Sequence, residues 1–170
     1  MWFASIWIFT LRLPWQLGAD FFLRHLLDGD AAVNTLSWRW VAGIQTQGKT
    51  YLATPENIEK FTDGRLGDIH GLATSAAPVS APPPPARRDI PELEDYSGAP
   101  ADRVGLLLHS DDLVAPDLAR WGIEPISTTY LECTALQSPW HIAPVVTKFR
   151  SALARDVAPD ALHLANAQAL

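Results

Sequence analysis

Two carboxylates, an amide and an indole lie at a regular spacing near position 30. Asp28 and Asp30 flank Gly29, and Asn34 and Trp38 follow Asp30 at intervals of four residues. In a helix, residues at i, i+4 and i+8 share one face, so these last three side chains would meet a common neighbour. A carboxylate accepts ring N–H groups, an amide donates and accepts, and an indole is flat and oxidisable. Such a face suits a planar, polar ligand.

The same spacing also fits a purely structural arrangement. Asp30 would then cap the N-terminus of a helix, and Asn34 and Trp38 would be ordinary residues of its buried face. The spacing alone leaves both interpretations open.

The elements that must position these side chains are predicted to be helices. The apolar periodicity and the capping signals predict helices over residues 2–11, 14–27, 31–40 and 55–61. Pro14 suits the first turn of the second helix, Asp30 suits the N-cap of the third, and Thr54 followed by Pro55 suits the start of the fourth. Residues 1–66 therefore have the pattern of a helical domain.

The apolar run at the N-terminus is predicted to be a buried helix. Residues 1–11 have no basic residue and no clear cleavage site, unlike a signal peptide. Arg12 and Pro14 end the run well short of the roughly 20 residues that a membrane span needs. We therefore expect no membrane association.

The rest of the chain has a different pattern. Residues 67–102 contain a Pro-rich stretch that favours extended geometry, so we expect a linker there. Residues 103–170 are predicted to form a small α/β segment with strands at 104–109, 126–131 and 161–165 and helices at 116–121 and 142–154. No Gly-rich phosphate loop follows any of these strands, so no motif supports nucleotide binding there.

The run from Leu26 to Trp40 resembles the flavin-binding signature of the DNA photolyase/cryptochrome family. That signature reads Asp-Gly-Asp, three residues, Asn, three residues, Trp, one residue, Trp. The preceding Met-Trp-Phe-Ala-Ser and the step from Pro14 through Trp15 to Gly18 are similar to the family in the same order. The resemblance covers residues 1–66, and a long run of ordered matches is more specific than a short motif. It implies a mainly helical fold, part of the FAD-binding domain of that family.

The resemblance implies roles for the residues around the ring. Asp28 would pair with an arginine close to the flavin, and Asp30 would accept a hydrogen bond from the polar edge of the isoalloxazine. Gly29 lies between them in the cofactor-binding motif. Asn34 would face the flavin N5. The implied cofactor is FAD.

Four further positions carry the implied electron transfer and DNA contacts. Trp38 would be the first member of an electron-transfer chain and Trp15 the second. Trp40 would stack against a flipped-out pyrimidine dimer, and Met1 would touch the lesion. The implied partner is DNA that contains pyrimidine dimers, and the implied reaction is light-driven electron transfer to the dimer, held out of the base stack. Asn34 is a neutral amide and cannot readily protonate a flavin, which favours repair over plant-type signalling.

The resemblance is incomplete at its N-terminal side. The Asn and two Arg of the family's Asn-Arg-x-Arg-Met motif would precede Met1, and the phosphate-binding half of the pocket, the third Trp and the antenna domain have no counterpart. We therefore expect an N-terminally truncated segment in which Asp28 lacks its arginine. Two alternatives are a cryptochrome-type flavin photoreceptor without repair activity and an inactive remnant or interaction fragment.

Composition restricts the remaining possibilities. The net charge of −6 argues against a protein that binds nucleic acid through a broad basic face. The only cysteine, Cys133, excludes an intrachain disulfide, fits a reducing cytoplasm and reads as a small buried hydrophobe. The segment from His109 to Asp112 could ligate a metal, but it is more typical of a solvated turn, so no metal is expected. Trp140 and His141 are expected at a helix start.

Overall fold

The computed structural model describes residues 1–82, 86, 88–89, 91–92, 103–114, 117–134 and 137–164. The chain divides into two compact units. The first contains residues 1–81 and 137–146, and the second contains residues 82–136 and 147–170.

The first unit is helical, as the sequence predicts. Its elements are α1 (Trp2–Ser5), the π-helix η1 (Ile6–Thr10), α2 (Trp15–Leu23), α3 (Ala31–Val41) and α4 (Pro55–Phe61). The predicted first helix is therefore a short α-helix that continues as a π-helix, with the Leu11 N–H donating to the Ile6 carbonyl at 2.9 Å. No helix in the described part of the chain is long and apolar enough to cross a membrane.

The second helix is shorter than predicted at both ends. Pro14 is its N-cap rather than a residue of its first turn, and the helix ends at Leu23 instead of Leu27. A side chain contacts a carbonyl group of the last turn: His25 Nδ1 lies 2.7 Å from the Phe21 carbonyl oxygen. This contact satisfies a terminal carbonyl group that a longer helix would have paired.

The other two caps are as predicted. Asp30 caps α3 with its side chain accepting from the Val33 N–H at 2.6 Å. Thr54 caps α4, accepting from the Asn57 N–H at 3.2 Å, and Pro55 is the first residue of that helix. Both caps depend on residues three positions apart, which explains why they could be read from local sequence.

The core of the first unit lies where α1, η1, α2 and α3 meet. Its buried members are Ala4, Ile8, Ala19, Trp38, Val41 and Ala42, and Trp38 is by far the largest. The small residues on α1 and α2 make room for this indole. Gly18 is the closest case, because a Cβ built on it would lie 2.3 Å from Trp38 Cη2.

Part of the predicted linker packs on these helices. The Val79 N–H donates to the Ala42 carbonyl at 2.9 Å, and the Val79 side chain packs against the core. The Ala73 N–H donates to Thr10 Oγ1 at 3.1 Å. The predicted linker residues 83–85, 87, 90 and 93–102 lie outside the described residues.

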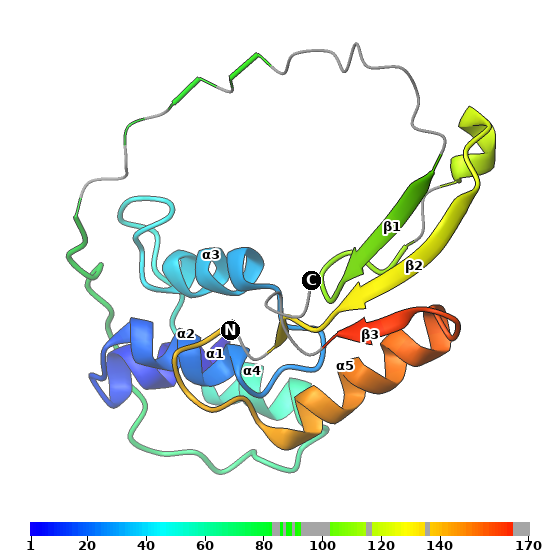
Figure 1. The fold of residues 1–170 in the computed structure, drawn as a ribbon. Helices are drawn as coiled ribbons and strands as arrows, with labels where there is room; N and C mark the ends of the chain where they lie inside the picture. Colours follow the sequence, from blue (N-terminus) through cyan, green and yellow to red (C-terminus); the bar gives the residue numbers. More distant parts are fainter. Residues whose placement is uncertain are drawn as a thin grey trace. The chain divides into compact units, whose positions relative to one another are not determined.

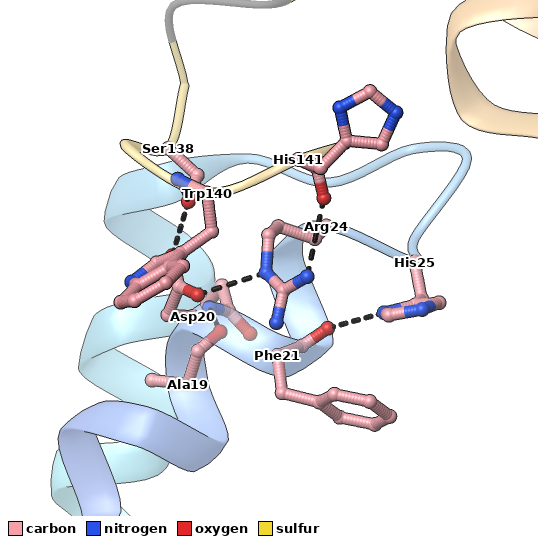
Figure 2. Close-up of polar contacts among 9 residues, drawn as sticks. Ala19, Asp20, Phe21, Arg24, His25, Ser138, Trp140 and His141 are labelled. Atoms are coloured by element: carbon pink, nitrogen blue, oxygen red, sulfur yellow. Dashed lines mark hydrogen bonds and ion pairs between the residues drawn. The ribbon is translucent and has the colours of Figure 1, made fainter. Parts of the chain in front are cut away.

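Residues 137–146 lie against α2 and will be called the strap (Figure 2). Ser138 Oγ donates to Asp20 Oδ1 at 2.5 Å, and Asp20 Oδ2 also accepts from Arg24 Nε at 2.9 Å. Arg24 Nη1 in turn donates to the His141 carbonyl at 3.1 Å. The prediction of a helix start at Trp140 and His141 is wrong: these residues precede the helix, which begins at Pro144, where the ring replaces an N–H that would be unpaired anyway.

The second unit contains a small parallel sheet of three strands in the order β1-β2-β3, shown side by side in Figure 1. Its elements are β1 (Val104–His109), the 3₁₀ helix η2 (Leu118–Trp121), β2 (Pro125–Leu131), α5 (Pro144–Val157) from Thr147 onwards, and β3 (Leu162–Leu164). Leu108 on β1 lies opposite Tyr130 on β2, and Tyr130 lies opposite His163 on β3. The strand–helix alternation agrees with the predicted α/β segment.

Alternate residues of β1, such as Leu107, are exposed, and the core forms on the other face around Leu108 and Tyr130. Two details of the prediction need correction. The predicted helix at 116–121 is a single 3₁₀ turn, and Pro116 lies outside the described residues. The helix α5 extends to Val157 because Ala154 and Ala158 continue its buried face.

Candidate functional site

A cavity of about 470 Å³ opens beside the N-terminus of α3. Its volume falls in the range of about 300–1,000 Å³ that is usual for ligand pockets. Its lining is mostly apolar and includes a few short polar side chains. The lining residues are Met1, Ala4, Phe22, Leu26, Asp28, Gly29, Asp30, Val33, Asn34, Ser37, Trp38 and Val41.

Asp30 places a carboxylate at the mouth of this cavity. The side chain is exposed, and the bond from the Val33 N–H engages its Oδ1. A negative charge at a helix N-terminus is favoured by the partial positive charge of the unpaired N–H groups there. Asp30 can therefore cap the helix and still offer its second oxygen to a ligand.

Asn34 lies one turn further along α3 and is 8% exposed. Its Nδ2 donates to the Ala19 carbonyl of α2 at 2.8 Å. This buried bond joins the two helices and fixes the orientation of the amide. The oxygen of the amide is the atom that is left to accept from a ligand in the cavity.

Trp38 follows Asp30 and Asn34 on the same face of α3 and is only 3% exposed. Three aromatic rings surround it edge-on: Phe3, Trp7 and Phe22 lie with centroids 6.3, 6.3 and 5.7 Å away and planes inclined at 81°, 89° and 75°. The indole is therefore held by packing. Asp30, Asn34 and Trp38 all line one cavity, as the i, i+4, i+8 spacing predicts.

Asp28 and Gly29 border the same cavity from the loop before α3. Asp28 is exposed, and within the described part of the chain it forms no ion pair with an arginine. Gly29 is buried, and a Cβ built on it would lie 3.1–3.2 Å from atoms of Leu23 and Leu26. A side chain at this position would push the loop away from the end of α2.

Of the remaining predicted site residues, one lines this cavity and two do not. Met1 lines the cavity and is 59% exposed. Trp40 does not line it: this ring lies on the surface, with its centroid 6.3 Å from that of Tyr51. Trp15 lines a second cavity of about 320 Å³, which shares Asn34 with the first.

Residues 1–65 match the family described as the FAD binding domain of DNA photolyase. This part of the chain is similar to the FAD-binding domain of the photolyase family. The cofactor of that domain is FAD.

The similar curated proteins are all deoxyribodipyrimidine photo-lyases. The protein of Streptomyces griseus is 50% identical over 77 residues, which cover 45% of this chain and 17% of the relative. The protein of Escherichia coli is 28% identical over 95 residues, covering 56% of this chain and 17% of the relative. The chain therefore spans about a sixth of the length of these two relatives. No solved structure matches the chain.

The lining of the cavity fits the flavin ring better than the rest of FAD. The carboxylate and amide groups that line it suit the polar edge of an isoalloxazine, and Trp38 on the same helix face adds a flat apolar surface. The diphosphate needs backbone N–H groups or basic side chains. Among the described residues that line the two cavities, there is no lysine or arginine.

Sequence reasoning missed several lining residues and one aromatic neighbour. Ser37 and Val41 lie on the same face of α3 as Asn34, so extending the helical period would have found them. Trp7 was not singled out, although it stands four residues after Phe3 in an apolar helix. That spacing signals an aromatic pair, and the two rings are stacked with centroids 6.1 Å apart.

The candidates outside the helical unit have structural roles in the described residues. His109 Nδ1 accepts from the Asp111 N–H at 3.3 Å within a tight turn. The described residues contain no group of three His, Cys, Asp or Glu side chains that could hold a metal ion. Burial raises the pKa of the Cys133 thiol, and the carboxylates of Glu132 and Asp111 raise it further. A thiol with a raised pKa is a poor nucleophile.

Proposed function

We propose that residues 1–65 supply the ring-binding part of the FAD site of a photolyase-type flavoprotein. One observation carries this proposal: Asp30, Asn34 and Trp38 line a single cavity of ligand size in a segment that matches the FAD binding domain of DNA photolyase. The proposal covers the family segment and assigns no function to residues 103–170. We also propose that the chain consists of a partial FAD-binding domain (residues 1–66), a linker (residues 67–102) and a small α/β segment (residues 103–170).

In this proposal, Asp30 and Asn34 form hydrogen bonds with the edge of the flavin ring. Asp30 accepts from a ring N–H with the carboxylate oxygen that the helix cap leaves available. Asn34 presents its amide oxygen towards N5, because its Nδ2 is engaged by Ala19. Asp28 is exposed and available to an arginine from another segment. Gly29 keeps the loop close to α2, so that both carboxylates face the cavity.

The proposed activity is light-driven repair of pyrimidine dimers in DNA. When bound, a reduced flavin supplies the electron that splits the dimer. Trp38 closes the inner end of the cavity and excludes water there. Met1 and the exposed face of Trp40 would contact the flipped-out lesion. Asn34 cannot donate a proton as a carboxylic acid would, which suits a site that retains one reduced state.

A chimera tests this proposal without any assumption about the rest of the protein. The segment of the Streptomyces griseus photo-lyase that aligns with residues 1–65 would be replaced by this chain's residues. We expect the chimera to purify with bound flavin and to restore light-dependent survival after ultraviolet damage in a repair-deficient bacterium. A folded chimera that binds no flavin would refute the proposal.

Two point variants of the chimera sharpen the test. Asn34→Ala removes the ring-facing amide and should lower flavin occupancy. Ala32→Ser, on an exposed position of the same helix that lines neither cavity, should leave it unchanged. A chimera that binds flavin but does not restore survival would favour the photoreceptor alternative over repair.

A further inference from the structure

The second cavity, of about 320 Å³, lies between α2 and α3 and shares only one residue with the proposed flavin site. Its volume is at the lower end of the range that is usual for ligand pockets. Ala19 and Ala31 leave this space open, because their side chains end at Cβ. The shared residue is Asn34, whose Nδ2 donates to the Ala19 carbonyl at 2.8 Å, so this bond lies in the wall between the two cavities.

Trp15 gives this cavity a flat aromatic surface. It is the first residue of α2, and it is half-buried, with part of its ring packed against the core. Among the described residues, no aromatic ring is paired with Trp15, whereas Trp7 and Trp38 contact each other with centroids 6.3 Å apart. A planar ring that enters the cavity can therefore stack on this indole, and every nucleobase has a π-face suited to such stacking.

Gln16 of α2 and Thr35 of α3 supply hydrogen-bonding groups to the same cavity. Both side chains are exposed, and neither forms a hydrogen bond with another described residue. A glutamine amide presents a donor and an acceptor in one plane, which matches the N6 and N7 atoms of adenine. A threonine hydroxyl both donates and accepts, so it suits a ring nitrogen or a ribose hydroxyl. The edge groups thus favour a planar base with an amino group.

The charge of Asp20, which also lines the cavity, is already balanced within the protein (Figure 2). Its carboxylate accepts from Ser138 Oγ at 2.5 Å and from Arg24 Nε at 2.9 Å. Arg24 donates in addition to the His141 carbonyl at 3.1 Å, so its guanidinium is engaged on two sides. The described lining residues include no other cation for a phosphate group, which would lie close to a carboxylate instead. The cavity therefore suits a neutral ligand better than an anion.

We propose that the second cavity binds a neutral adenine nucleoside. The base stacks on Trp15, and its N6–N7 edge pairs with the amide of Gln16. This site is distinct from the flavin site and does not depend on the proposed function. Binding rests on one stacked ring and a few hydrogen bonds, so it should be weak and is best followed on the ligand.

Saturation-transfer NMR of the full chain with adenosine as the probe tests this proposal. We expect transfer to the two purine ring protons, with a saturable dependence on the adenosine concentration. AMP should bind more weakly, because its phosphate lies near the Asp20 carboxylate. Uridine should also bind more weakly, because it has no amino group and no N7. If AMP binds more tightly than adenosine, the charge argument and the proposal are wrong.

Ala31→Phe and Ser37→Phe are matched variants at two exposed positions of α3. The first fills the second cavity and the second fills the flavin cavity. Adenosine affinity should fall at least about tenfold in Ala31→Phe and stay unchanged in Ser37→Phe. Trp15→Ala should cause a similar loss, as expected for a ring that stacks on a base. Trp140→Ala removes an exposed indole of the same unit that lines neither cavity, and it should leave the affinity unchanged.

The controls keep the possible outcomes separate. Far-ultraviolet circular dichroism reports whether each variant is folded. A folded chain that shows no transfer to adenosine, or binding that persists in Ala31→Phe, would overturn the inference. Loss of binding in Ser37→Phe, or displacement of adenosine by riboflavin, which has no adenine, would place the nucleoside in the flavin cavity and would also overturn it. A chimera that binds no flavin would refute the proposed function and leave the adenosine site standing.

Discussion

Replacing Gly18 by alanine should test how tightly α2 and the Trp38 indole fit together. The added Cβ would lie 2.3 Å from Trp38 Cη2, 2.4 Å from Trp38 Cζ3 and 2.9 Å from Trp7 Nε1. Non-bonded carbon atoms prefer about 3.5–4.0 Å. The indole must therefore move by more than an ångström, in a core where both rings are held by aromatic neighbours.

Two effects of opposite sign set the size of the change. Overpacking a well-packed core costs about 1–3 kcal/mol. Alanine is favoured over glycine inside a helix by about 0.8–1.0 kcal/mol, and Gly18 lies in the middle of α2. The two together predict a net loss of about 0–2 kcal/mol in the free energy of unfolding of the helical unit.

A double-mutant cycle with Trp38→Phe separates these effects. Phenylalanine lacks the Cη2 and Cζ3 atoms that meet the new methyl group. In that background Gly18→Ala should be less destabilising than in the unaltered chain, because the two closest contacts are gone and the contact with Trp7 Nε1 at 2.9 Å remains. Urea unfolding followed by circular dichroism measures all four proteins. If Gly18→Ala has the same effect with either residue at position 38, the close approach does not limit stability and the reasoning is wrong.

Substitutions at three further positions probe single contacts. Asp30→Ala should lower the free energy of unfolding by about 0.5–2 kcal/mol through loss of the α3 cap, whereas Asp30→Asn should retain the cap in urea unfolding and lower only flavin occupancy in the chimera. Ser138→Ala removes a donor from Asp20 and should cost about 1 kcal/mol, with faster protease cleavage of the strap as the readout. Burial, and then the charge of Glu132, raise the pKa of Tyr130 from its ordinary 10 to about 12. The contribution of Tyr130 to the free energy of unfolding should therefore be fully present below pH 10 and be lost as the pH rises towards 12, because the unfolded chain releases this proton at a lower pH. Tyr130→Phe should remove this part of the loss of stability at alkaline pH.

Local sequence signals predicted the elements that hold the candidate site. The Asp30 cap and the Thr54–Pro55 start each depend on residues within one turn, so the sequence contains the whole signal. The shared face of Asn34 and Trp38 follows from the helical period alone. The three short strands were predicted because β-branched and apolar runs alternate with turn residues.

Contacts between distant parts of the chain could not be predicted in this way. Ser138 and Asp20 are 118 positions apart, and nothing in either local sequence marks the other as its partner. The π-helix η1 also escaped prediction, because its residues are as suited to an ordinary α-helix. The Trp7–Trp38 contact needs the packing of two helices and the absence of a side chain at Gly18, which only the assembled core reveals.

Because of the strap, the helical unit consists of two separate segments of the chain, one that ends at Ala81 and one that begins at Gln137. A cut placed within residues 83–102 would therefore divide the backbone without dividing that unit. Ile142 is buried, the Ala143 N–H donates to the Arg24 carbonyl at 3.0 Å, and the Asp20–Ser138 bond adds a charged contact. The two pieces should elute together from a sizing column in native buffer and separate only in denaturant. The nicked protein would then be a two-chain complex, able to re-form from separately produced halves.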